Sequence, residues 1–575
     1  MNRRQRRAAL KQNPPGAAAT TAGDVRQLFA LAMQAQAQHR LDEAARTYRR
    51  VLAQAPDHAE ASNNLGCVLQ AQGKLAEASA CFAQALALVP QLADNFPGLC
   101  AALQSVLPPL AAALARADAT WPRRLSLDEL FGGDTLGSIA ADPFLLRILA
   151  TAPVRDIAFE RMLTSLRRAL LDRADAPIDL ASALARQCFL NDYVFFAEDD
   201  ESARAEALRT SLAESVAAGA GVPALLLTAV AAHFPLHSIP GIAELLDRPW
   251  PEPVGALLVQ QIAEPRAEEG LRASIPRWTG ISAGVSERVR HQYEESPYPR
   301  WVKLPPPEPA PLSAHLGRFI PRALLEPAIP EAAPEILVAG CGTGQEPIDL
   351  ARQVSGARVT AVDLSLASLA YAKRKTHELG LPNVEYAQAD IVEMGSLGRT
   401  FDVISSVGVL HHLAEPEAGW RTLAALLRPG GFMQVGLYSE KGRRDLAPAR
   451  ERIAARGEEP TPAAIRRSRR EILDSDEFPR LARLRDLYGM NECRDLLFHV
   501  QEHRFTLPQV ERIVHALGLS FLGFVVEPAV RIAFRRRFPE EGSESRLDRW
   551  DAFEDEFPDT FAGMYIFWLR KPAGA

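Results

Sequence analysis

The chain has 575 residues, which at about 150 residues per domain predicts about four domains and excludes a single small module. Charged residues make up 24% of it and hydrophobic residues 47%, an ordinary globular composition that argues against a wholly disordered or fibrous protein. The formal charge of −6 provides no bulk attraction to nucleic acid or to an anionic membrane. No apolar stretch reaches the ~18 residues that a membrane span needs. We therefore expect a cytoplasmic protein with no membrane span and no nucleic acid partner.

Residues 1–23 combine an arginine-rich start with a tract of proline, glycine, alanine and threonine. This segment has no periodic apolar face that could pack on a core. It is predicted to be a disordered basic tail.

An internal repeat follows, because the sequence matches itself after a shift of 34 positions. The matched pairs are Leu31 and Leu65, Leu41 and Leu75, Ala44 and Ala78, Tyr48 and Phe82, and Pro56 and Pro90. The pattern resembles the tetratricopeptide repeat, which we assign to residues 24–108. A third copy begins at Leu92 and is interrupted by Pro108 and Pro109. Two interpretations are open: the repeats recruit a protein partner, or they cap the next domain.

Residues 126–284 form the predicted helical middle domain. Apolar residues recur there at three-and-four spacing, as in 159–171 and 178–190. No catalytic motif occurs in this region, so its role stays undefined.

The sequence from Glu335 to Gly344 predicts a buried strand that turns into a helix through alternating glycines. A dinucleotide fingerprint, G-x-G-x-x-G, would need a glycine where this chain has Gln345. The motif present, G-x-G-x-G, resembles the glycine loop of class I S-adenosylmethionine-dependent methyltransferases. The resemblance implies cofactor contacts along the whole loop: Gly340, Cys341, Gly342, Thr343 and Gly344.

Two acids end the next two predicted strands. Asp363 follows the strand 358–362 and can accept two hydrogen bonds from the vicinal hydroxyls of a ribose. Asp390 follows the strand 384–387, and in the family an acid at this point meets the adenine amino group. The resemblance adds Leu364, Ile391 and Ser406 as further cofactor contacts.

The remaining strands are predicted at 401–407, 432–438, 519–526 and 560–569, with a helix over 508–517. The resemblance covers about residues 290–571 and is to the small-molecule branch of the family, which includes quinone-biosynthesis enzymes. It implies a Rossmann-like α/β domain with seven strands over residues 312–575. The predicted fold is thus multidomain: a helical repeat solenoid, a helical middle region and a methyltransferase domain.

One position departs from the family. The residue two before the first glycine is normally an acid that holds the methionine end of the cofactor, and here it is Val338. Glu346, just inside the following helix, either substitutes for that acid or only complements the helix dipole. Without a substitute, cofactor affinity would be weak.

His411 and His412 follow the fourth strand at the open edge of the sheet, where either can act as a base. The alternative is a packing pair, because the same string occurs in the family without a catalytic role. The sulfonium already activates the methyl group, so the protein mainly aligns the acceptor and removes a proton.

Two segments resemble parts of a substrate pocket. Residues 285–311 form a proline-stiffened lid or linker with four candidate pocket residues: Tyr293, Tyr298, Arg300 and Trp301. The insertion 440–507 contributes His499 and His503, four residues apart. No metal is expected, since these histidines lack a third ligand and the six cysteines form no C-x-x-C pair.

The leading hypothesis is methyl transfer from S-adenosylmethionine to a small organic acceptor, with the repeats serving partner or self interaction. A second is a protein methyltransferase that the repeats recruit to its substrate. A third, raised by Val338, is a non-catalytic scaffold with a vestigial methyltransferase fold.

Overall fold

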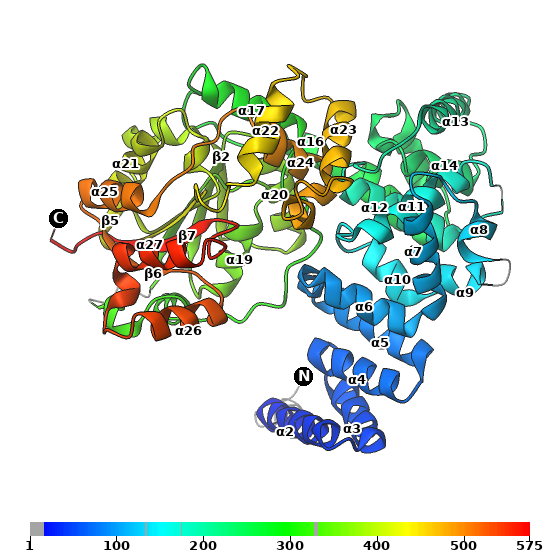
Figure 1. Cartoon of the computed structure of the whole chain (residues 1–575), viewed down its shortest axis with the longest axis horizontal. Coiled ribbons are helices and arrows are strands. Elements are labelled where there is room, and N and C mark those ends of the chain that lie inside the picture. The colour runs from blue at the N-terminus through cyan, green and yellow to red at the C-terminus, as the bar shows by residue number, and fades with distance from the viewer. Residues whose placement is uncertain (1–16, 133–134, 174, 327–331, 575) are drawn as a thin grey trace, which may run out of the picture.

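The structure is a computed structural model that describes residues 17–132, 135–173, 175–326 and 332–574. It consists of a helical N-terminal half and a C-terminal half built on a seven-stranded sheet, lying side by side (Figure 1). The predicted fold class is confirmed. Of the predicted basic tail, residues 1–16 lie outside the described residues. Residues 17–23 are helical rather than disordered, because the first helix begins at Ala17.

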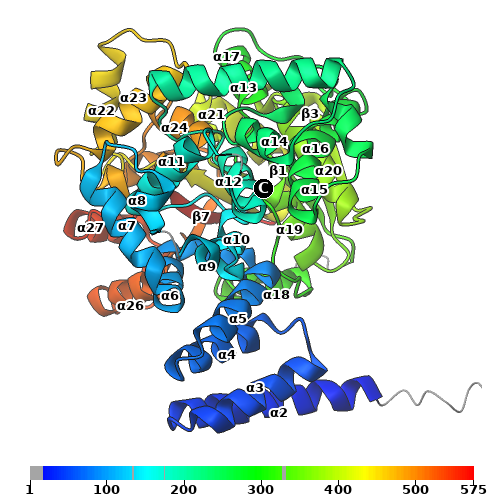
Figure 2. The ribbon, with the colours of Figure 1, turned by 90° about the vertical axis from the view of Figure 1, so that its right-hand side faces the viewer.

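The two repeats are helical hairpins. A small and an aromatic residue meet between the helices of the second repeat, because a Cβ on Gly66 would lie only 2.7 Å from the Phe82 ring. The first repeat projects from the rest of the molecule in both views (Figures 1 and 2). The four helices are α2 (Ala17–Ala37), α3 (Leu41–Gln54), α4 (Ala59–Ala71) and α5 (Leu75–Leu88).

The helical array continues past the second repeat. Pro108 and Pro109 open helix α7 (Pro108–Thr120) directly after α6 (Phe96–Val106). Proline fits the first turn of a helix, where its missing N–H has no partner to lose. Among the described helices none is long and apolar enough to span a bilayer alone, and only the pair α6 and α7, bent by 118°, passes such a test jointly.

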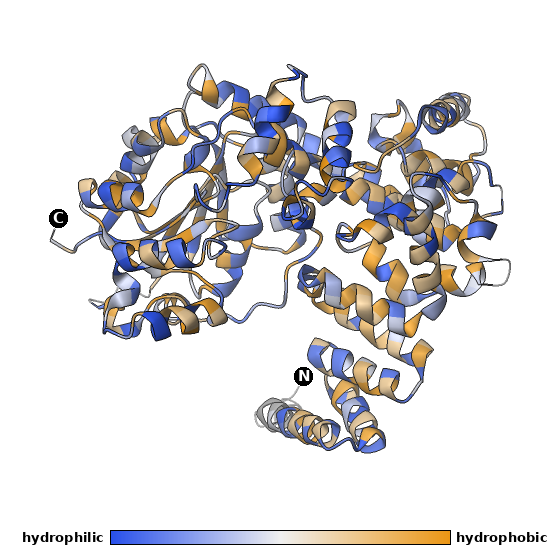
Figure 3. Cartoon of the chain, viewed as in Figure 1, coloured by the Kyte–Doolittle hydropathy of each residue, from blue (hydrophilic) through white to orange (hydrophobic). Residues whose placement is uncertain are grey.

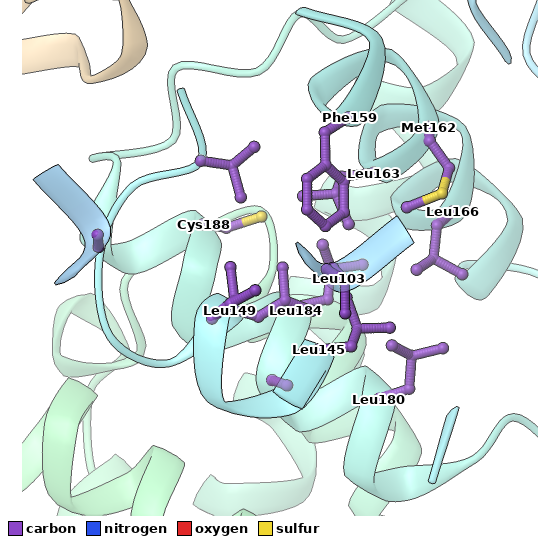
Figure 4. Packing of buried hydrophobic residues seen from close by; sticks show 14 of the residues in the cluster. Leu103, Leu145, Leu149, Phe159, Met162, Leu163, Leu166, Leu180, Leu184 and Cys188 are labelled. Carbon is purple, nitrogen blue, oxygen red and sulfur yellow. The ribbon is translucent and has the colours of Figure 1, made fainter. Parts of the chain in front are cut away.

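The middle region adds further helices to this array. Its apolar side chains do not form a core of their own: one cluster runs from Ala32 to Ile262. Figure 4 shows part of this cluster, with Phe159, Leu184 and Cys188 facing one another. The helices are α8 (Leu127–Phe131), α9 (Leu136–Ala140), α10 (Pro143–Leu149), α11 (Ile157–Leu170), α12 (Ile178–Leu190), α13 (Asp199–Ala217), α14 (Ala224–Ala231), α15 (Glu252–Leu258) and α16 (Glu264–Arg272).

The insertion 440–507 belongs to the same cluster, although it is part of the C-terminal half in sequence. Apolar residues from Leu446 to Leu497 pack with the helical half rather than with the sheet. Arg469 pairs with Glu160 of α11 at 2.7 Å, and the N–H of Met490 donates to the carbonyl of Asn191. The helices of the insertion are α22 (Leu446–Ala454), α23 (Pro462–Leu473) and α24 (Met490–Phe498).

The sheet has the strand order β3-β2-β1-β4-β5-β7-β6. Strands β1 to β5 are parallel, and β7 pairs antiparallel with both β5 and β6. Buried parallel strands therefore bring the ends of β1 to β4 to one edge. The strands are β1 (Glu335–Ala339), β2 (Arg358–Asp363), β3 (Val384–Gln388), β4 (Phe401–Val407), β5 (Leu427–Leu437), β6 (Ser520–Phe524) and β7 (Tyr565–Arg570).

Helices cover both faces of the sheet, and each face has its own apolar cluster. Polar and apolar residues alternate along these covering helices (Figure 3), as expected of helices with one buried side. The helices that concern the site are α17 (Val285–Glu295), α19 (Gln345–Gln353), α20 (Leu366–Glu378) and α21 (Pro416–Leu426). The C-terminal ones are α25 (Leu507–Ala516), α26 (Pro528–Arg537) and α27 (Leu547–Glu556).

Candidate active site

The glycine loop joins β1 to α19. Gly340, Gly342 and Gly344 have φ angles of 80°, 51° and 82°, a region that other residues enter only at a cost. A Cβ on Gly340 would lie 2.4 Å from Val409, and one on Gly344 would lie 2.4 Å from Ala372. The protein's own packing and backbone conformation therefore require these glycines.

Asp363 lies against this loop at the end of β2. Its carboxylate accepts hydrogen bonds from the N–H of Gly342 at 2.8 Å and from the N–H of Ser365 at 2.9 Å. Burial raises its pKa, against the effect of these hydrogen bonds. A carboxylate offers about four acceptor sites, so two remain for ribose hydroxyls.

Asp390 lies at the end of the neighbouring strand and is fully buried. Its carboxylate accepts hydrogen bonds from the N–H of Ser282 at 3.1 Å and of Val392 at 3.3 Å. Leu364 and Ile391 line the same end of the cavity. Leu364 and Ile391 thus provide an apolar surface beside the Asp390 carboxylate. This combination suits a flat ring that bears an amino group.

Glu346 occupies the region where the family's acid is missing. Val338 is buried within β1, whereas the Glu346 side chain lines the cavity and accepts a hydrogen bond from the Ser405 hydroxyl. Burial raises the pKa of Glu346. Ser405 is the strand neighbour of Val338, so its hydrogen bond places the Glu346 carboxylate close to the position of the usual acid.

Some predicted cofactor contacts lie behind the cavity wall. Thr343 is fully buried and donates its hydroxyl to the Pro299 carbonyl. Ser406 donates to the Ala339 carbonyl at 3.1 Å. Neither residue lines the cavity, and nor does Gly344, whereas Cys341 does. The hydroxyls of Thr343 and Ser406 serve the protein's own hydrogen bonds, so direct cofactor contact at these three positions stays a prediction.

The candidate pocket residues of the predicted lid, 285–311, fall into two sets. Tyr293 of α17 and Tyr298 line the cavity. Arg300 instead forms an ion pair with Asp192 of the helical half at 2.6 Å, and the Trp301 indole donates to the Thr343 carbonyl at 3.1 Å. Arg300 and Trp301 thus anchor the segment and do not line this cavity, but both line a neighbouring cavity of about 170 Å³. Their role in a substrate pocket stays a prediction.

Three of the four predicted histidines, His411, His412 and His499, form one cluster, and of these only His412 lines the cavity. His411 lies behind it, with the two Nε2 atoms 3.1 Å apart, and His499 stacks on His412 at 3.7 Å between ring centroids. Burial lowers the pKa of His412 and of His499 to about 3. His503 contacts the side chain of Gln501 instead.

Asp495 is a cavity residue that the sequence analysis missed. It lies on α24, and its Oδ1 accepts a hydrogen bond from the Tyr293 hydroxyl at 2.6 Å. Tyr438 and Met564 complete this wall. One signal was available, since Asp495 precedes His499 by four residues on a predicted helix.

The donor atoms of His412, Asp495 and His499 all lie within 4.8 Å of one another. The two imidazole rings, however, are stacked with an interplanar angle of 22°. A metal bound to a histidine lies in the plane of the ring, about 2.0–2.1 Å from the nitrogen. No ion can satisfy two stacked rings at once, so this arrangement does not fit a metal.

These residues enclose a cavity of about 390 Å³. Three carboxylates of the methyltransferase-like part of the chain line it (Asp363, Asp390 and Glu346), together with tyrosines, His412 and Asp495. The three carboxylates fit S-adenosylmethionine, whose ribose, adenine and amino group each need an acceptor.

Profiles of two known families match the chain. One is described as a methyltransferase domain and matches residues 336–431, and the other as a tetratricopeptide repeat and matches residues 24–91. The chain therefore carries a methyltransferase domain behind N-terminal tetratricopeptide repeats, as the sequence predicted. The cofactor of such a domain is S-adenosylmethionine.

Individual relatives cover only part of the chain. An uncharacterized protein of Synechococcus sp. is 34% identical over 206 residues, which are 33% of this chain and 48% of that protein. A ubiquinone biosynthesis O-methyltransferase of Methylocella silvestris is 38% identical over 98 residues, 17% of this chain and 37% of that enzyme. The chain thus spans half or less of the length of these curated relatives.

Solved structures are similar over a comparable part. PKMT2 from Rickettsia typhi, in complex with AdoHcy, is 16% identical with a TM-score of 0.31, covering 41% of this chain and 48% of that one. YcgJ from Bacillus subtilis is 17% identical with a TM-score of 0.24, covering 42% of this chain and 89% of that one.

Proposed function

We propose that this protein transfers a methyl group from S-adenosylmethionine to a small organic acceptor. The observation that carries the proposal is a single cavity in which the glycine loop, Asp363, Asp390 and Glu346 face a wall of tyrosines. The bound cofactor supplies an activated methyl group. The protein then has to orient the acceptor and exclude water.

In this proposal the cofactor contacts are divided among three carboxylates. Asp363 holds the ribose hydroxyls, Asp390 the adenine amino group and Glu346 the amino group of the methionine end. Asp390 is buried and the other two are half-buried, and charged hydrogen bonds are strong where water is partly excluded. Glu346 thereby replaces the missing acid at Val338 and removes the main argument for a vestigial domain.

A second cavity supports an alternative acceptor. It has a volume of about 170 Å³ and shares Tyr298 and Arg485 with the first cavity, while Asp94 and Arg155 of the helical half form its far wall. An extended polar acceptor, such as a polypeptide chain, would fit a path between the two halves. Protein methylation is therefore the second candidate.

Calorimetry with S-adenosylmethionine tests the shared premise. We expect binding, and no detectable heat at millimolar cofactor would reject both enzyme proposals. Replacing Asp363 by alanine should weaken binding by ~1–3 kcal/mol, since two buried hydrogen bonds are lost. Glu385→Ala is the control, because Glu385 pairs with Arg399 and does not line the cavity.

The acceptor class is tested by labelling. Cell lysate is incubated with the protein and with S-adenosylmethionine that carries a labelled methyl group. Label in the solvent-extractable fraction supports a small acceptor. Label in precipitated protein supports the polypeptide alternative and contradicts our first proposal.

A further inference from the structure

We propose that Asp495 is the proton acceptor of the methyl transfer, and that the acceptor group is a hydroxyl on a planar ring. This inference rests on the methyltransferase function proposed above. It assigns a catalytic role to a residue of the insertion, outside the part of the domain that the family profile matches.

The geometry leaves one oxygen of Asp495 free. Its Oδ1 accepts the hydroxyl of Tyr293 at 2.6 Å, and no other hydrogen bond to its side chain occurs among the described residues. The side chain is only 12% exposed, yet it lines the cavity. A buried acceptor with an unfilled site favours a ligand that brings a donor.

The neighbouring histidines are poorer candidates for the base. His412 donates Nδ1–H to the Gln501 carbonyl at 2.8 Å, and its Nε2 faces His411. His499 accepts the N–H of Gln501 at Nδ1, which places its proton on Nε2, toward Tyr293 and Asp495. His499 and Tyr293 are therefore positioning residues that hold the carboxylate.

The shape of the wall indicates the acceptor. Tyr293, Tyr298 and Tyr438 surround Asp495 with aromatic rings, and Met564 closes the end. Aromatic and thioether side chains pack well against a planar ring. A hydroxyl on that ring can donate its hydrogen to the free oxygen of Asp495.

The proposed step balances without any further reactant. Asp495 takes the proton of the acceptor hydroxyl, and the freed lone pair on oxygen forms a bond to the methyl carbon. The bond between that carbon and the cofactor's sulfur breaks, and its electron pair stays on sulfur. The products are a methyl ether, a neutral thioether and a protonated Asp495.

The helical half sets the position of this base. Helix α24 packs its Cys493, Leu496 and Leu497 into the cluster shared with the middle region, and the N–H of Met490 is bound to Asn191. The N-terminal half thus completes the active site in addition to any partner that it binds.

Catechol is the test acceptor, with benzylamine and benzoate as probes of other chemistry. Asp495→Asn keeps the size of the side chain and an acceptor for Tyr293 but removes the charge. We expect methyl transfer to catechol to fall about a hundredfold or more. Binding of catechol to the complex with S-adenosylhomocysteine should weaken about tenfold, and calorimetric affinity for S-adenosylmethionine should stay within twofold.

Two variants serve as controls. Glu492→Gln removes another half-buried carboxyl of α24, one that does not line this cavity, and should leave transfer to catechol unchanged. Asp495→Glu keeps a carboxylate and should be more active than Asp495→Asn. Unchanged cofactor binding in each variant verifies that the site is folded.

Four outcomes would overturn the inference. The first two concern the variants: Asp495→Asn keeps more than a tenth of the wild-type rate, or Glu492→Gln is as impaired as Asp495→Asn. In the third, the wild-type protein methylates benzylamine or benzoate but not catechol. In the fourth, it binds the cofactor but neither binds nor methylates catechol. Failure of the wild-type protein to bind S-adenosylmethionine is a separate result, which rejects the proposed function itself.

Discussion

At the scale of single residues, the site depends on carboxylates that are already half-buried or buried in the unliganded protein. Burial raises the pKa of Asp363 and of Glu346, because the charged form loses hydration. A cationic ligand reverses this effect. We therefore expect the protonation of these carboxyl groups to change when the cofactor binds.

We predict that cofactor binding releases protons. Near the raised pKa values the unliganded protein holds part of its carboxyls protonated, and the cofactor's positive charge favours the ionised form. Affinity should rise with pH up to these pKa values and be level above them. Calorimetry in two buffers of different ionisation enthalpy measures the released protons, and equal heats in both buffers would contradict the prediction.

Glu346→Gln should reduce this proton release and weaken binding about tenfold or more, since a charged hydrogen bond is lost. Release does not vanish, because Asp363 still titrates. Glu385→Gln, on an exposed acid, should change neither quantity. If Glu346→Gln binds like the wild type, Glu346 only complements the helix dipole.

The location of site residues at the ends of strands could be predicted from the sequence. The location of residues that depend on contacts between distant parts of the sequence could not. The glycine loop, Asp363 and Asp390 follow from strand periodicity and spacing. Arg300 was expected to line the pocket, but its partner Asp192 lies 108 positions away. Asp495 was overlooked because only the folded insertion brings it to Tyr293, 202 positions away.

At the scale of elements, the insertion is the part of the fold that the sequence located but could not place. Its bounds at 440–507 were predicted, and its position against the helical half was not. The buried pair of Arg469 and Glu160 joins α23 to α11 across 309 positions. Their side chains are 4% and 6% exposed, so each charge depends on the other.

We predict that Glu160→Gln lowers the free energy of unfolding by ~3–5 kcal/mol, because it leaves a buried guanidinium without its counter-ion. Denaturant unfolding measures this loss. The double variant Glu160→Leu with Arg469→Met should recover most of it, since no unpaired charge remains. If the double variant is as unstable as Glu160→Gln, the attraction within the ion pair outweighs the cost of burying both charges, and our explanation is contradicted.

At the scale of the whole molecule, the two halves share a core. The repeats, the middle region and the insertion form one apolar cluster, while the sheet has two clusters of its own. The predicted boundaries at 24–108 and 126–284 stay predictions, because no gap in this core marks them. We therefore expect the helical half to unfold together with the active site.

Hydrogen exchange tests that cooperativity. A ligand at one hundred times its Kd adds about 2.7 kcal/mol to every opening that destroys its site, so exchange through such openings slows about a hundredfold. With S-adenosylmethionine we expect this slowing in the core of α11 and α12, which contact the insertion. The first repeat, α2 and α3, packs on the second repeat and can open alone, so its exchange should not change. Unaltered exchange in α11 and α12 would show that the halves open independently and that the helical half does not hold the active site together.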